Sequence, residues 1–269
     1  MSQPSVIVRI AGDQSPFVTM TLAQAAALGR IPGASNRTAF GVCNSLQTST
    51  PPCALWPLQV PRVRLYTNTA LEILSSSAND TLLGTGAQQV AITSVDQNFV
   101  ETNSVINLNG TTPVAIPQGI FINASVVGGS GSGRKNAGNI TIRTVSGANP
   151  QSYIEAGAGL ARLASFCVPA NCIWICHNFF SIMDAGTTWP AQVRIETVII
   201  LPNGNEIKAL PLRMSATSPA SIPVPDGFTF TAGQILEYQI SLVTDNNSFT
   251  SFGLTGTLID TTQLDLTLV

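Results

Sequence analysis

The sequence has few charged side chains: Asp, Glu, Lys and Arg together make up 10% of its 269 residues. Soluble domains normally carry about a quarter of charged residues, so much of this surface is expected to be neutral polar or apolar. Such a surface favours contact with neighbouring proteins over dispersal. The formal net charge is −2, with 12 Lys and Arg against 14 Asp and Glu. Because no basic excess is present to hold a phosphate backbone, nucleic-acid binding is not expected.

Long hydrophobic runs are also missing. No stretch of the sequence approaches the ~18 to 20 apolar residues of a membrane span, so no membrane partner is expected. The apolar run Val6–Ile10 has no charged segment before it and no cleavage motif after it, so it is not read as a secretory signal. Hydrophobic residues nevertheless make up 44% of the chain. This content predicts a packed protein rather than a disordered one.

Histidine is almost absent, which limits the chemistry that the chain can perform. The single histidine, His177, lies in an apolar run with Asp184 nearby in sequence. No nucleophile elbow accompanies them, so a core or interface histidine is favoured over a catalytic one. Cys167, Cys172 and Cys176 precede His177 but form no C-x-x-C pair, and zinc usually takes its four ligands from two such pairs. We therefore assign no catalytic, cofactor-binding or metal-ligating residue, and expect no cofactor.

The five cysteines leave their pairing open. Cys172 and Cys176 lie four residues apart, which is ~13 Å on an extended strand. A disulfide needs Cα atoms within about 7 Å, so this pair is predicted not to be bridged to itself. Buried thiols are the favoured interpretation, although Cys43 and Cys53 could be bridged in oxidising surroundings.

Two further patterns have a catalytic and a structural interpretation. Paired carboxylates could hydrolyse glycosides, and the candidates are Asp80, Asp96, Glu101, Asp184 and Glu196. Sequence alone cannot place any two of them at the required ~5 to 9 Å. Asp80 is expected to bond turn amides instead. The Gly-rich stretch 128–138 contains Arg134 and Lys135, but no helix follows it and the G-x-x-x-x-G-K-[ST] pattern is absent. A mobile hairpin tip is therefore favoured over a phosphate site.

Six N-x-S/T sequons could accept glycans in a secreted eukaryotic protein. They begin at Asn36, Asn79, Asn109, Asn123, Asn139 and Asn246. Without a signal peptide, turn chemistry is the favoured explanation for these asparagines.

What the chain does have is strand alternation, concentrated between Leu71 and Ile142. Apolar and polar residues alternate here, and clusters of Ser, Asn, Asp and Gly separate the runs. Three turn blocks punctuate the stretch: SSSANDTLLGTG (75–86), LNGTTPV (108–114) and KNAGNITI (135–142). Asn109-Gly110 favours a type I′ hairpin turn. The pattern predicts short antiparallel strands joined by tight turns.

This succession of turn blocks, with Glu101-Thr102 between them, resembles a family of virion proteins. That family occurs in tailed bacteriophages of marine and freshwater bacteria, with relatives in large DNA viruses of algae. Gly33, Phe40-Gly41 and Trp56 match its upstream segment, and the Val168-Pro169-Ala170 turn matches the start of its downstream β domain. The cysteines of the second half depart from the family. The resemblance implies a structural part of a virus particle, with no catalytic residues to carry over.

The first 61 residues show a different pattern from the rest of the chain. Thr21 is placed to cap a short helix through Ala23–Leu28, which Gly29 and the residues after it end. The following segment contains Pro51, Pro52, Pro57 and Pro61, and proline disfavours both helix and central strand. Residues 1–61 are therefore predicted to form an arm over the body or over a neighbouring subunit.

Two β domains are predicted after the arm, at residues 62–150 and 160–269, with a boundary in the irregular stretch 148–159. Six strand candidates follow Leu160, with Asn203-Gly204 as a second hairpin signal. The tail QLDLTLV (263–269) alternates and is expected to add an edge strand.

The fold class expected is therefore all-β: two β-sandwich-like (jelly-roll-like) domains with an irregular or helical N-terminal arm. The expected function is a non-enzymatic virion structural protein, either a minor capsid, cement or vertex component. The alternatives are a tail or fibre component that contacts the host surface and, less favoured, a virion-borne carbohydrate-binding or glycan-cleaving protein. The expected partners are copies of itself and a major capsid or tail protein, and the expected location is the virion.

Overall fold

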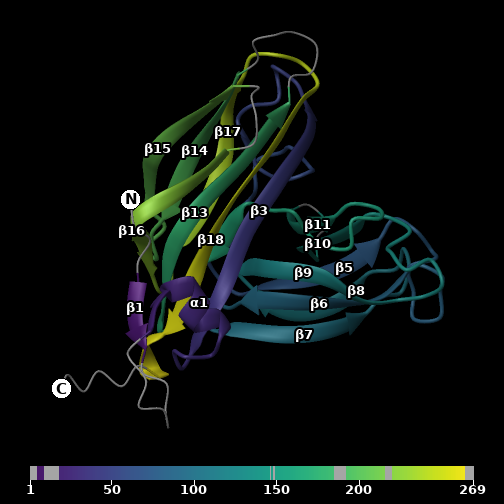
Figure 1. The fold of residues 1–269 in the computed structure, drawn as a ribbon. Helices are drawn as coiled ribbons and strands as arrows, with labels where there is room; N and C mark the ends of the chain where they lie inside the picture. Colours follow the sequence, from purple (N-terminus) through teal and green to yellow (C-terminus); the bar gives the residue numbers. More distant parts are fainter. Residues whose placement is uncertain are drawn as a thin grey trace.

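The computed structural model describes residues 5–8, 18–145, 147, 149–184, 192–215 and 220–263. Antiparallel strands dominate it and form an upright large lobe and a small lobe that projects from its side (Figure 1). The all-β prediction is confirmed. No helix among the described residues is long and apolar enough to cross a membrane.

The large lobe consists of two antiparallel sheets. The first has the order β16-β13-β18-β3, and the second has the order β12-β17-β14-β15, with β4 also paired to β17. The bounds are β3 Ala34–Leu46, β4 Cys53–Ala54, β12 Ser165–Cys167, β13 Cys172–Asp184, β14 Gln192–Ile200, β15 Glu206–Ser215, β16 Ala220–Thr231, β17 Ile235–Val243 and β18 Ser248–Asp260.

One hydrophobic core fills the space between these two sheets. Apolar residues alternate along the strands, so each strand turns one face inward, and both sheets contribute to the same buried cluster. Trp174 of β13 and Tyr238 of β17 are its largest fully buried side chains from the strands. Trp174 packs against Phe166 with ring centroids 4.6 Å apart, and Tyr238 packs against Phe252 at 4.5 Å. These aromatic pairs hold the two sheets together.

The small lobe also has two antiparallel sheets, with the orders β11-β10-β5-β8 and β7-β6-β9. Its bounds are β5 Thr69–Ser75, β6 Ala87–Val95, β7 Glu101–Asn107, β8 Val114–Gly119, β9 Phe121–Ser130, β10 Ile140–Thr144 and β11 Pro150–Ile154. Aliphatic residues of both sheets, such as Ile73, Ile92 and Ile142, form a separate core. This lobe contains the stretch in which the sequence shows the clearest alternation.

The small lobe interrupts one edge strand of the large lobe, whose two halves are β4 and β12. Leu55 N–H donates to the Tyr238 carbonyl at 2.9 Å, and Tyr238 N–H donates to the Ala164 carbonyl at 3.0 Å. β4 and β12 therefore lie end to end along the same edge of β17, and residues 56–163 leave and return between them. Gly41 of β3 faces this gap, where a Cβ atom would overlap the Leu55 carbonyl oxygen.

A third buried cluster joins the lobes. It contains Val95 and Phe121 of the small lobe, together with Val198, Ile200 and Ile235 of the large lobe. Burial of apolar surface stabilises such contacts by about 25 cal/mol per Å². The relative position of the lobes is thus supported by packing.

The predicted arm at residues 1–61 is wrong for its second half. β3 pairs with β18 over most of its length, from Ala34 to Leu46, and Leu46, Leu55 and Trp56 are almost fully buried. The prolines that suggested an arm, Pro51 and Pro52, lie in the short loop between β3 and β4. Long-range pairing with the C-terminal strand determines this structure, and local composition does not reveal such pairing.

The start of the chain agrees better with expectation. Thr21 caps α1 (Leu22–Ala27) in a capping box, in which its side chain accepts from Gln24 N–H and the Gln24 side chain accepts from Thr21 N–H. Before the helix, β1 (Ser5–Val8) pairs with β2 (Val18–Thr21). After β18 a 3-10 turn, η1, spans Thr261–Gln263. Nearly all of the predicted edge strand at 263–269 lies outside the described residues.

Two local predictions need correction, and a third is confirmed. Asn109-Gly110 does not close a hairpin, because β7 and β8 on either side belong to different sheets; only Gly110 of the pair has a positive φ, 60°. The stretch 148–159, predicted to be irregular, contains β11. Asn203-Gly204 does close the β14–β15 hairpin, as predicted.

Candidate functional site

His177 is a structural residue of the large lobe. It lies on β13 and is 5% exposed, and its Nε2 lies 2.8 Å from Thr257 Oγ1 on β18. Thr257 Oγ1 in turn donates to Asn36 Oδ1 at 3.1 Å. Burial lowers the pKa of the imidazole. Asp184 lies seven residues further along the same strand, roughly 23 Å away, so the two predicted neighbours are not brought together.

The cysteines are free thiols, and all but Cys172 are buried. Burial raises the pKa of Cys53 to about 11 and that of Cys167 to about 12, the latter despite the nearby Arg62. Cys43 donates to the Trp56 carbonyl oxygen at 3.1 Å. Thiols with such raised pKa values stay protonated and are poor nucleophiles. Among the described residues no group of three or more His, Cys, Asp or Glu side chains is arranged to hold a metal ion.

Asp80 organises the tip of the small lobe. Its side chain is fully buried, with Oδ1 accepting from Ala87 N–H and Ala137 N–H at 2.7 Å each. Its Oδ2 accepts from Ser75 Oγ at 2.6 Å and from Gly138 N–H at 2.8 Å. The backbone of Asp80 bonds as well: its N–H donates to the Ser77 carbonyl oxygen, and its carbonyl oxygen accepts from Gly110 N–H. All three turn blocks recognised in the sequence thus meet at Asp80. The expected bonding of Asp80 to turn amides is confirmed.

The glycines of these blocks are needed for close approach. A Cβ on Gly86 would overlap Asp80 Oδ1, and one on Gly138 would lie 2.6 Å from Ser77 N. In the Gly-rich stretch, Gly131 N–H donates to Gly86 C=O and Gly133 N–H to Thr85 C=O, both at 2.8 Å. These donors are used within the protein, so the loop packs against residues 84–86 and does not present a phosphate cradle.

Three of the other candidate carboxylates, Asp96, Glu101 and Glu196, also have structural partners. Glu101 pairs with Arg37 of the large lobe at 3.1 Å, and Asp96 Oδ1 accepts two N–H groups of its own turn. Glu196 pairs with Lys208 at 3.4 Å across the β14–β15 hairpin. None of these arrangements pairs two carboxylates as glycoside hydrolysis requires.

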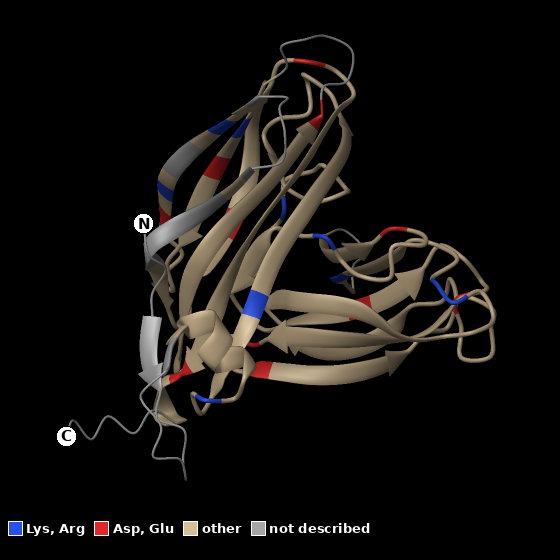
Figure 2. Ribbon diagram, in the orientation of Figure 1, with Lys and Arg blue, Asp and Glu red and all other residues tan. Residues whose placement is uncertain are grey.

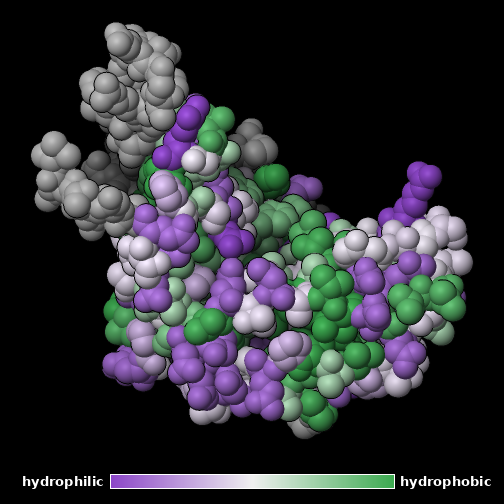
Figure 3. Space-filling view, turned by 90° about the horizontal axis from the view of Figure 1, so that it is seen from below, coloured by the Kyte–Doolittle hydropathy of each residue, from purple (hydrophilic) through white to green (hydrophobic). Residues whose placement is uncertain are grey.

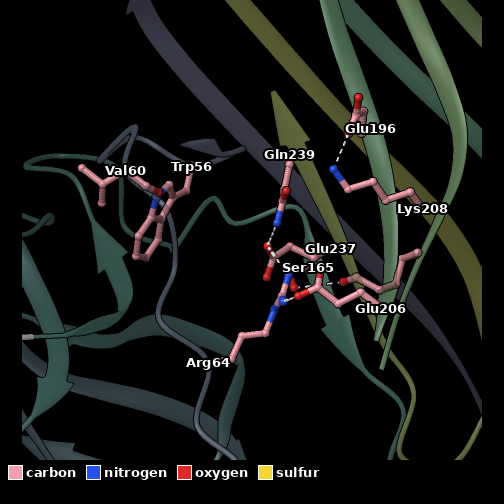
Figure 4. Close-up of polar contacts among 10 residues, drawn as sticks. Trp56, Val60, Arg64, Ser165, Glu196, Glu206, Lys208, Glu237 and Gln239 are labelled. Atoms are coloured by element: carbon pink, nitrogen blue, oxygen red, sulfur yellow. Dashed lines mark hydrogen bonds and ion pairs between the residues drawn. The ribbon is translucent and has the colours of Figure 1, made fainter. Parts of the chain in front are cut away.

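A polar cluster lies where the lobes meet (Figure 4). Arg64, in the segment that leads into the small lobe, binds Glu237 of β17 at 3.4 Å and also bonds Glu206 of β15. Gln239 Nε2 donates to the same Glu237 oxygen at 2.6 Å. Glu237 is 1% exposed. Burial lowers the pKa of Arg64, but Glu237 and Glu206 outweigh burial and raise it overall.

Arg62 is buried beside this cluster on the small-lobe side. Its guanidinium carbon lies 3.8 Å from the centre of the Phe121 ring, and its Nη2 donates to Gln151 Oε1 at 3.3 Å. Burial lowers the Arg62 pKa to about 10, an effect that Glu237 partly offsets. Arg62 therefore remains charged at neutral pH. Because breaking a buried pair typically costs about 3–5 kcal/mol, we interpret this junction cluster as a lock on the angle between the lobes. Sequence patterns do not reveal this cluster, since its members lie up to 175 residues apart.

A cavity of about 310 Å³ lies nearby, between β3 and the small lobe. Thr38 and Phe40 line one side, and β9 and residues 160–163 line the other. Its lining includes no charged side chain. It offers apolar and neutral polar contacts but no acid, base or nucleophile pair.

Comparisons with known proteins add little to this description. No family model matches the chain, and no curated protein matches it. The solved structures that match include infectious bursal disease virus Gx strain, at 11% identity and a TM-score of 0.27, covering 84% of this chain and 72% of that chain. T=1 particles derived from infectious bursal virus match at 10% identity and 0.26, covering 87% and 71%. The T13 particle of that virus matches at 9% and 0.26, covering 89% and 74%. Similarity at these scores carries no functional argument.

Proposed function

We propose that this chain is a non-enzymatic structural protein of a virus particle, a minor capsid, cement or vertex component, that acts through protein–protein contacts. The observation that carries the proposal is the strand order of the large lobe. If β4 and β12 count as one interrupted strand, eight strands form two sheets of four, and the first and last, β3 and β18, are neighbours. The chain passes repeatedly from one sheet to the other, as in a jelly roll, an architecture of viral capsid and lectin domains and of cupins.

The distribution of charge supports a capsid role over the other uses of a jelly roll. Lys, Arg, Asp and Glu are scattered singly over both lobes, and long stretches of the strands carry none (Figure 2). The small lobe is inserted through one edge strand and projects from the large lobe, so it offers a second surface to neighbours. The resemblance of the turn blocks to virion proteins points the same way.

The carbohydrate-binding alternative has less support. Sugar platforms need exposed aromatic rings, and Trp56, Trp174 and Tyr238 are almost fully buried. Among the large apolar and aromatic residues that the structure describes as exposed, the two aromatic ones are Tyr66 at 59% and Phe228 at 42%. A tail or fibre component remains the alternative within the structural class.

The proposal is tested by purifying particles, washing them in high salt and counting this protein against the major capsid protein by mass spectrometry. Contacts through apolar area and main-chain pairing resist moderate salt, whereas charge-driven contacts are screened. We expect retention at a fixed stoichiometry. Complete release by salt, or glycan turnover by the purified protein, would contradict the proposal. Cryo-electron microscopy of the same particles then distinguishes a capsid position from a tail position.

A further inference from the structure

The free edge of β7 is the surface of the small lobe that most needs a partner. β7 pairs with β6 from Glu101 to Asn107 without a register shift, and within the part of the chain that the structure describes no strand is paired with its other side. Leu108 N–H, just beyond the strand, donates to Gln88 C=O of the β6 side. Because the direction of backbone groups alternates along an antiparallel ladder, the N–H and C=O groups of residues 101, 103, 105 and 107 point away from β6.

Native edge strands are normally protected by proline, lysine, bulges or a covering segment. Other edges of this protein have such devices: β8, β11, β15 and β16 each contain a proline (Pro117, Pro150, Pro211 and Pro223). The outer edge of β9 is covered, since Val127 N–H donates to Gly159 C=O and Ala161 N–H to Ser125 C=O. β7, with the sequence ETNSVIN, has no proline, lysine or bulge.

The side chains of β7 are also suited to an added strand. Val105 is 63% exposed on the outer face of the sheet, and hydrophobic residues gather on the underside of the small lobe, where β7 is the lowest strand (Figures 1 and 3). On the same face Asn103 accepts from Thr93 at 2.7 Å and Asn107 from Gln89 at 2.9 Å. The single charge, Glu101, is at the end of the strand, bound to Arg37. Neither face of this edge repels a second strand.

We propose that β7 pairs antiparallel with β7 of a second copy of this chain, about a twofold axis at Ser104. This pairing places Asn103 opposite the partner's Val105 and Glu101 opposite the partner's Asn107, with about eight new backbone hydrogen bonds. The carboxylate of Glu101 then faces an amide that can donate to it. The inference deepens the proposed function, because it names one self-contact of the assembly.

Ser104 provides an independent reason for this register. Its Oγ is buried and has no hydrogen-bond partner among the described residues. At the centre of the twofold pair, Ser104 faces its own copy in a non-hydrogen-bonded position, where Cβ atoms lie about 4.5–5.5 Å apart and Ser or Thr hydroxyls bond across strands. The pairing thus gives the orphan hydroxyl a partner.

The contact is expected to be weak on its own. Stable interfaces commonly bury about 1,200–2,000 Å² in total, and a pair of seven-residue strands, each roughly 23 Å long, provides only part of that area. The contact therefore acts together with others in an assembly. A covalent trap is the suitable assay, because it accumulates a weak but specific pair.

The test is disulfide trapping with Ser104→Cys in the full chain under mild oxidation. Paired Cα atoms at the centre lie about 4.5 Å apart, within the range of a disulfide. Thr102→Cys is the matched control, since position 102 faces the partner's position 106 and the two substituted residues lie roughly 13 Å apart. We expect a covalent dimer from Ser104→Cys and none from Thr102→Cys or the wild type. Equal trapping at both positions, or none at position 104, would overturn the pairing.

A second pair of variants tests the edge without changing the core. Val105→Lys places two like charges diagonally across the axis, about 7–8 Å apart, and is expected to lower trapping by Ser104→Cys about fivefold or more. Val126→Lys, on β9 of the same sheet and 44% exposed, should leave trapping unchanged. An equal effect of both lysines would contradict the proposal.

The outcomes also separate this inference from the proposed function. If Ser104→Cys is not trapped but the protein stays in washed particles, the β7 pairing fails and the virion role stands. If trapping succeeds but particles lack the protein, the virion role fails and the pairing stands. Trapping that appears only after removal of residues 264–269 would mean that the tail covers this edge, and would overturn self-pairing.

Discussion

Substitution of the buried carboxylate of Asp80 by an amide should unfold the tip of the small lobe at much lower denaturant concentrations. Asp80 uses both oxygens, each with two donors at 2.6–2.8 Å. In Asp80→Asn one oxygen becomes an NH₂ group, which faces at least one backbone N–H in either orientation. A hydrogen bond to a charged group contributes about 1.5–3 kcal/mol, and a buried donor left without a partner costs about 1–3 kcal/mol. The expected loss is therefore about 3–4 kcal/mol.

Asp96 provides a matched control. Its two bonds, from Asn98 N–H and Val100 N–H, both go to Oδ1 at 2.8 Å, and asparagine keeps that oxygen. Asp96→Asn should therefore cost less than about 1 kcal/mol. The size and shape of the side chain change equally little in the two variants, so the difference measures the use of the second oxygen.

The assay is chemical denaturation combined with amide hydrogen exchange. A loss of 3 kcal/mol corresponds to a decrease in melting temperature of roughly 6–12 °C for a chain of this size. The amides of Ala87, Ala137 and Gly138, which bond the carboxylate, should lose protection first. If Asp80→Asn lies within about 1 kcal/mol of wild type, or matches Asp96→Asn, the carboxylate does not hold the turn blocks together.

Three further predictions concern the large lobe. Deletion of residues 1–61 removes β3 and should abolish the cooperative β melting transition; a truncated protein that still melts cooperatively would restore the arm. Replacement of residues 56–163 by two glycines joins Leu55 to Ala164. The large lobe should remain folded but be less stable by circular dichroism, because Ala164 N–H already donates to the Leu55 carbonyl oxygen at 3.2 Å. A shortened chain without a near-ultraviolet signal would contradict this. Burial lowers the pKa of His177 in the folded state, so the unfolded state binds the extra proton first and stability should fall as the pH drops below about 6.5. His177→Gln should show a smaller loss between pH 6.5 and 5 in parallel melts, and an unchanged loss would assign it to other groups.

The short-range features of the sequence were sufficient for much of the local structure. Thr21 identifies the start of α1 because an N-cap residue lies directly before the helix that it caps. Ile140 and Ile142 alternate with polar residues because one face of a strand is buried. Asp80 and its glycines were recognised as turn chemistry for the same local reason, although the three blocks that share this carboxylate could not be placed together.

Features that depend on pairing between distant residues were missed. Local composition predicts an arm at β3, because its partner β18 lies more than 200 residues away and the prolines after β3 give a stronger local signal. The junction cluster of Arg62, Arg64 and Glu237 was not identified either, because charged residues in separate strands have no common spacing.

The amino-acid pattern alone was enough to indicate an all-β, sparsely charged protein that is rich in turn-forming residues, because strand alternation and turn propensity are encoded within a few residues of one another. The three-dimensional fold was needed to show which strands share a sheet and that the small lobe interrupts one strand between Leu55 and Ala164. It was also needed to show that no strand in the described ranges pairs with the outer edge of β7. Hydrogen-bond ladders in an antiparallel sheet join segments of any sequence separation. The paired strands are stabilised by apolar surface that distant segments bury against one another. No local sequence pattern indicates which segments will pack together.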